Sequence, residues 1–173
     1  MPDRSKIVAV VAPHSSAVDF LIAIGLVFSW NLRIRYIGKK ELFRFPLGPA
    51  MYWLGGIAVD RQAPGGILDQ VVDEFHRSDR ILLGVAPEGT RTPGSRWKSG
   101  FYWIATRGNA AIVPVYLDWS RHVIGILPPF EPTDNPRADL AAIARLFLPY
   151  TRKDGLHIDP EAAVRESGSA RPS

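Results

Sequence analysis

The residues Ile7-Val8-Ala9-Val10-Val11-Ala12 form a short, continuous apolar run rich in β-branched side chains, and Pro13-His14-Ser15-Ser16 follows it directly. A run of this kind, bounded by a turn, is typical of a strand buried on both faces of a parallel sheet. The run Ile81-Leu82-Leu83-Gly84-Val85-Ala86 repeats the pattern and also passes into a polar loop. Two such strands predict an α/β domain.

Helical and strand patterns alternate along the rest of the chain. This alternation implies a single α/β domain with a mostly parallel mixed sheet flanked by helices. The domain is predicted to cover residues 1–150, and the polar residues 151–173 are predicted to form a flexible tail. Further strands are predicted at 32–37 (ended by Gly38), 57–59, 111–119 and 122–127, and helices at 17–28, 40–54 (broken near Pro46 or Pro49), 67–76, 98–107 and 137–150.

The composition narrows the function classes. The chain has 173 residues, of which 46% are hydrophobic and 22% charged, so it is a globular protein and not a disordered one. The absence of cysteine excludes a disulfide scaffold, a thiolate zinc site and a cysteine nucleophile. The net charge of +4 and a pI near 9.6 suggest an anionic partner, which could be nucleic acid, a membrane surface or a phosphorylated substrate.

The sequence shows neither a membrane-spanning segment nor a signal peptide. Its most apolar run, Phe20–Trp30, is eleven residues long, whereas a spanning helix needs roughly 20. The apolar run at 7–12 is shorter than the core of a signal peptide. We therefore expect an intracellular protein that could still contact a membrane at its surface.

Polar loops follow three of the predicted strands. In open α/β sheets, ligands bind in the loops beyond the carboxyl ends of the strands. The chemistry is therefore expected in the loops Pro13–Asp19, Asp60–Gly66 and Pro87–Arg96.

His14 and Asp19 are the candidates for acid–base chemistry in the first loop. Histidine can deprotonate a hydroxyl near neutral pH, and a carboxylate on its other ring nitrogen would orient it and stabilise the imidazolium. The spacing allows the first helical turn to bring the two side chains together. Asp19 also lies three residues after Ser16, where it could instead complete a capping box.

The other two loops carry arginines. Glu88, Gly89, Thr90 and Arg91 leave the sheet together, and a carboxylate beside a guanidinium there could organise a phosphate or acceptor site. The alternative is a surface ion pair on a turn. Arg61 follows the strand 57–59, where a solvated arginine beside Asp60 is the alternative.

Taken in order, these motifs resemble the glycerolipid acyltransferase family, the lysophosphatidic acid acyltransferase-like enzymes. The resemblance runs from about Ile7 to Val115 and rests on four motifs and on the stretch Arg96–Phe101. The family often has Asn before the histidine and an aromatic residue before the aspartate, where this chain has Pro13 and Val18. The four motifs are His14-x4-Asp19, Gly56-Ile-Ala-Val-Asp-Arg61, Pro87-Glu-Gly-Thr-Arg91 and Val113-Pro114. We expect Pro114 near a strand start or on a sheet edge. This last motif is expected to shape a pocket wall.

The resemblance implies an acyltransferase with the corresponding fold. His14 would be the general base on an acceptor hydroxyl and Asp19 would orient it. The donor would be an acyl-CoA or acyl-carrier-protein thioester, and the acceptor a lysophospholipid, above all 1-acyl-glycerol-3-phosphate. No metal or other cofactor is implied. The acceptor's phosphate or glycerol part would be held by Arg61, Glu88, Gly89, Thr90 and Arg91.

The segment Lys39–Leu54 combines aromatic and aliphatic residues with Lys39, Lys40 and Arg44. It fits either an interfacial segment on an anionic leaflet or a helix packed on the sheet, and both interpretations stay open. The first would make the protein cytoplasmic and peripheral on the inner face of the cell membrane.

Two other function classes compete with catalysis. A lipid- or phosphate-binding domain could keep the fold without turnover, but such a domain would need neither His14 nor Asp19. The basic pI alone would also fit nucleic-acid binding, but no nucleic-acid motif accompanies it, so we expect no nucleic-acid partner.

Overall fold

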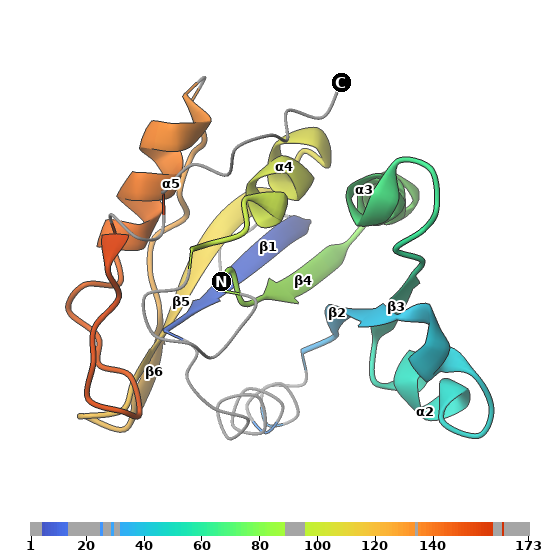
Figure 1. Cartoon of the computed structure of the whole chain (residues 1–173), viewed down its shortest axis with the longest axis horizontal. Coiled ribbons are helices and arrows are strands. Elements are labelled where there is room, and N and C mark those ends of the chain that lie inside the picture. The colour runs from blue at the N-terminus through green and yellow to red at the C-terminus, as the bar shows by residue number, and fades with distance from the viewer. Residues whose placement is uncertain are drawn as a thin grey trace.

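The computed structural model describes residues 5–13, 25, 29, 32–88, 96–133, 135–160 and 164. Its centre is a six-stranded sheet in the order β3-β2-β4-β1-β5-β6, which confirms the predicted α/β fold (Figure 1). Strands β1 to β5 run parallel and β6 is antiparallel to β5. The strands are β1 Lys6–Ala12, β2 Ile34–Lys39, β3 Gly56–Val59, β4 Ile81–Val85, β5 Ala111–Asp118 and β6 Val123–Ile126.

Strand β1 lies in the interior of the sheet between β4 and β5. Val10 is level with Val85 on one side and with Pro114 on the other. Most residues of β1 are buried, as expected for a strand covered on both faces. The apolar run that suggested an α/β domain is therefore the strand around which the sheet is built.

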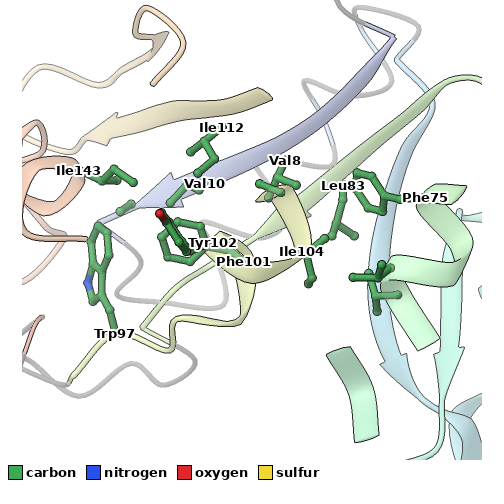
Figure 2. Packing of buried hydrophobic residues seen from close by; sticks show 14 of the residues in the cluster. Val8, Val10, Phe75, Leu83, Trp97, Phe101, Tyr102, Ile104, Ile112 and Ile143 are labelled. Atoms are coloured by element: carbon green, nitrogen blue, oxygen red, sulfur yellow. The ribbon is translucent and has the colours of Figure 1, made fainter. Parts of the chain in front are cut away.

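Helices and the sheet enclose one main core, which Figure 2 shows at close range. Alternate residues of β1 point to opposite faces, so Val8 and Val10 belong to the main core while Ile7 lies in a second, smaller cluster with Ala111 and Val113. Within the described residues, the helical elements are the 3-10 turn η1 Lys40–Phe43 and the α-helices α2 Gly48–Trp53, α3 Gly66–Arg77, α4 Gly100–Arg107 and α5 Pro136–Arg145.

One local expectation was wrong and another holds in part. Gly38 lies inside β2 and does not end it; a side chain there would meet the ring of Phe43 at 2.8 Å, which explains a glycine at this position. Pro114 lies inside β5 opposite Val10 of β1, but just outside the residues Val115–Asp118 that pair with β6, so its expected place on an edge holds on that side. Its carbonyl accepts a hydrogen bond from Leu127, but it has no N–H to return one, and the β6 ladder ends at that point.

Other elements agree more closely with the sequence pattern. The predicted helix at 40–54 is interrupted, with η1 before Pro46 and α2 after it. The strands predicted at 111–119 and 122–127 are present as β5 and β6, which form an antiparallel hairpin. The predicted helix at 17–28 lies outside the described residues apart from Gly25.

The packed part of the domain continues beyond residue 150, where the sequence pattern placed its boundary. The backbone N–H of Trp119 donates to the carbonyl of Thr151. Arg152 and Ile158 are both buried. A polar composition suggested a tail here, but its first part packs against the end of β5.

Two phenylalanines in different environments test this description. Phe75 on α3 is 0% exposed, whereas Phe45 is 91% exposed. We predict that Phe75→Ala lowers the free energy of unfolding by about 3–5 kcal/mol, because it opens a cavity in the core. Phe45→Ala should change it by no more than about 0.5 kcal/mol. Denaturant unfolding of both variants checks this, and equal losses would contradict the packing.

Candidate active site

The first and third polar loops leave the sheet side by side. Val10 and Val85 are level in the adjacent parallel strands β1 and β4, so the two strands end at the same edge. Pro13 continues from β1, and Pro87 and Glu88 continue from β4. The topology thus places the start of the His14 loop beside the start of the Glu88 loop. Asp19 and His14 themselves lie outside the described residues, as do Gly89, Thr90 and Arg91, so their contacts stay predictions.

Glu88 points into the protein, and its carboxylate is paired there. The Arg152 guanidinium donates from Nη1 to Glu88 Oε2 at 3.2 Å, and each residue is only 3% exposed. Arg152 Nε also contacts both carboxylate oxygens of Asp154, at 3.1 and 3.2 Å. The hydrogen bond from Arg152 holds the pKa of Asp154 below its usual range. A surface ion pair is therefore excluded for Glu88.

The loop that follows Glu88 is fixed at both of its ends. The backbone N–H of Lys98 donates to the carbonyl of Pro87 at 2.8 Å. Trp97 is buried, and its ring contacts the rings of Phe101 and Phe147 in edge-to-face geometry at 6.3 and 5.8 Å. These contacts determine where residues 89–95 begin and end, although that stretch itself is not described.

Arg61 lies in an ordered turn after β3, and its side chain is exposed. The side-chain amide of Gln70 on α3 brackets the backbone of Asp60: Oε1 accepts from the Asp60 N–H at 3.0 Å and Nε2 donates to the Asp60 carbonyl at 2.7 Å. The Asp60 carboxylate accepts from the Gln62 backbone N–H at 2.9 Å and from Lys40 Nζ at 3.5 Å. The backbone bond from Gln62, assisted by Lys40, lowers the pKa of Asp60.

The structure does not bring Arg61 next to the other two loops at the sheet edge. Strand β3, which precedes Arg61, is separated from β1 by β2 and β4. Three strand spacings correspond to a lateral distance of about 14 Å. Strand β2 pairs with β4 through Ile34 and Arg35 only, so the edge strands diverge further. Arg61 would therefore act at the border of a site centred on β1 and β4.

Asp118 is a further buried carboxylate, at the carboxyl end of β5. Burial alone would raise its pKa, but hydrogen bonds from the Ser120 hydroxyl and from neighbouring backbone N–H groups hold the pKa below its usual value. Ser120 Oγ donates at 2.7 Å, and Arg121 lies 3.6 Å away. Through these contacts Asp118 stabilises the turn between β5 and β6.

Sequence reasoning missed two residues that shape this region, Arg152 and Gln70. Arg152 is in a polar stretch of Gly, Lys and Asp, where no pattern distinguishes a buried arginine from a solvated one. Gln70 is in the predicted helix at 67–76, and its helical position gave no sign of a contact with Asp60. Arg152 contacts a residue far away in the sequence, and Gln70 contacts Asp60 across the turn between β3 and α3. Neither contact can be read from a local pattern.

Within the described part of the chain, no three His, Cys, Asp or Glu side chains are grouped closely enough to bind a metal ion. No helix within it is both long and apolar enough to cross a bilayer.

Comparisons with known proteins agree with the α/β fold. The family model described as Acyltransferase matches residues 2–118. The crystal structure of the 1-acyl-sn-glycerophosphate (LPA) acyltransferase PlsC from Thermotoga maritima is similar in fold, with a TM-score of 0.55 and 23% sequence identity. The similarity covers 84% of this chain and 66% of the length of that one. No curated protein sequence matches the chain.

The buried pair of Glu88 and Arg152 yields a stability prediction. Arg152→Met should lower the free energy of unfolding by about 3–5 kcal/mol, because it leaves a buried carboxylate without its guanidinium. Adding Glu88→Gln in the same chain should restore about 1–3 kcal/mol. Urea unfolding of the two single variants and the double variant checks this. Strictly additive losses would show that the two side chains are not coupled.

Proposed function

Because the chain belongs to the acyltransferase family, we propose that it transfers a fatty acyl group from an acyl-CoA or acyl-carrier-protein thioester to the hydroxyl of a lysophospholipid, with 1-acyl-glycerol-3-phosphate as the preferred acceptor. One observation carries this proposal. The loops that hold the predicted base and the predicted acceptor-binding residues follow the adjacent parallel strands β1 and β4. Both substrates could therefore meet at one edge of the sheet.

In this mechanism His14 is the general base and Asp19 orients its ring. The imidazole takes the proton of the acceptor hydroxyl as the oxygen attacks the thioester carbonyl. A carbon–oxygen bond forms, the carbon–sulfur bond breaks, and the departing thiolate takes up a proton. The reaction needs no covalent enzyme intermediate, which fits a chain without cysteine. Holding both substrates against one base supplies a large part of the rate.

The acceptor is assigned to the loop after β4 and to Arg61. Gly89, Thr90 and Arg91 would contact its phosphate or glycerol part, and arginine suits phosphate because its guanidinium donates two parallel hydrogen bonds. Glu88 is buried against Arg152, so we assign it to fixing the start of this loop. The exposed Arg61 would hold the outer part of the acceptor.

The same chemistry on another lyso-lipid or on a small alcohol is the first alternative. Strand β3, which precedes Arg61, is separated from β4 by β2, which favours testing several acceptors of different size. A catalytically silent lipid- or phosphate-binding domain of the same fold is the second alternative. It predicts acceptor binding without release of the donor thiol.

Thiol release from acyl-CoA tests the proposed base. With 1-acyl-glycerol-3-phosphate present, we predict that His14→Ala lowers the initial rate about 10²–10⁴-fold, because proton removal from the hydroxyl is lost. His76→Ala is the matched control. This histidine is exposed near the end of α3, and its Nε2 lies 3.0 Å from the backbone carbonyl oxygen of Arg107.

The His76 variant should keep the wild-type rate. Release that does not depend on an acceptor would identify a thioesterase instead. In a further outcome, wild type binds an acceptor yet releases no thiol from acyl-CoA or acyl-carrier protein with any acceptor. That result would identify the chain as a catalytically silent binding domain.

A further inference from the structure

The large apolar side chains most exposed to solvent cluster in one short segment. Phe45 is 91% exposed and Trp53 77%. Leu42, Leu47 and Tyr52 in the same segment are exposed as well. Among the Phe, Tyr and Trp side chains that the structure describes, the exposed ones are Phe45, Tyr52 and Trp53, and all three lie in this segment. The interpretation of Lys39–Leu54 as a helix buried on the sheet is therefore wrong.

The segment is nevertheless firmly attached to the edge of the sheet. The Phe43 ring packs so closely on β2 and β3 that a side chain at Gly38 or Gly56 would meet it at 2.8 or 2.5 Å. The Tyr36 hydroxyl donates to the Met51 carbonyl at 3.3 Å. Figure 1 shows α2 at one end of the molecule, beyond β2 and β3. The apolar side chains are thus displayed outward from a fixed support.

Cationic side chains accompany the exposed apolar ones. Lys39 and Arg44 belong to the segment and are exposed, and Arg33 is exposed just before β2. Lys40 is also largely exposed while it bridges Asp60. The one acidic side chain of the segment is Glu41. Apolar and aromatic side chains beside lysine and arginine are the combination that inserts at a bilayer interface whose headgroups are anionic.

We infer that the surface formed by Lys39–Trp53, here called the docking surface, binds the anionic leaflet of a phospholipid membrane. The excess of positive charge around it complements such a leaflet. A second copy of the chain would instead bring like charges together, because it carries the same cations. Five large exposed apolar side chains within one short segment are typical of an interaction site rather than of an ordinary protein surface.

The docking surface is directly connected to one of the candidate acceptor residues. Lys40 bonds the carboxylate of Asp60, the neighbour of Arg61. A leaflet on this surface would therefore present lipid headgroups beside the Arg61 turn. This last link rests on the proposed function, whereas the binding of the leaflet does not.

Co-sedimentation of the full chain with vesicles tests the inference. The vesicles contain equal parts of phosphatidylcholine and phosphatidylglycerol, and no acyl donor is added. We predict that Phe45→Ser/Trp53→Ser lowers the partition coefficient at least about tenfold, because the inserted apolar area is lost. The matched control is Leu146→Ser/Leu148→Ser, an exposed apolar pair outside the docking surface, which should bind like wild type.

A second pair of variants tests the electrostatic part. Lys39→Glu/Arg44→Glu should abolish binding to the anionic vesicles, whereas Arg77→Glu/Arg80→Glu, also exposed, should reduce it only slightly. Wild-type binding should weaken as salt is added. Circular dichroism and thermal unfolding of each variant verify that it is folded.

Three outcomes would overturn the inference. In the first, the wild-type protein stays in the supernatant. In the second, the Phe45→Ser/Trp53→Ser variant binds vesicles like wild type. In the third, light scattering shows that wild type is a dimer and that this variant is a monomer. The third would identify a second copy as the occupant. Acyl transfer to a soluble acceptor without vesicle binding would refute docking alone, and vesicle binding without transfer from any donor would refute the proposed function alone.

Discussion

The double pairing of β1, with β4 on one side and β5 on the other, is the constraint on which the rest of the structure depends. Parallel strands in register end at one edge, so the loops that follow β1 and β4 must start as neighbours. Alternating side chains of β1 also divide the interior into two clusters on opposite faces. A shift of one residue in this register would exchange the two faces. The same ladder therefore fixes the fold and the positions from which the two loops start.

The buried pair of Glu88 and Arg152 adds a contact across 64 positions of sequence. Buried ion pairs contribute little net stability compared with apolar packing, but breaking one is costly. Moving the start of the loop after β4 would separate Glu88 from Arg152, so the pair favours the observed position of that loop. It also makes residues 151–156 part of the domain, through the turn in which Arg152 contacts Asp154.

The central architecture could be predicted because it depends on local patterns. The runs at 7–12 and 81–86 carry the β-branched signal of buried strands, and the order of the motifs alone indicates the family. Non-local contacts could not be predicted. The place of Gly38 inside β2 depends on the Phe43 ring that packs on it, and the place of Pro114 depends on where the pairing of β5 with β6 stops. The exposure of Lys39–Trp53 likewise depends on how the rest of the chain packs around this segment, which a local sequence pattern does not show.

Identification of the product by mass spectrometry tests the proposed acyl transfer directly. Purified protein is incubated with one acyl-CoA of defined chain length and a mixture of 1-acyl-glycerol-3-phosphate, its dephosphorylated analogue and other lysophospholipids. We predict that the phosphorylated glycerol acceptor gains one acyl chain for each CoA released, and faster than its dephosphorylated analogue does. Consumption of the thioester with only free fatty acid formed, and no acylated lipid, would contradict it.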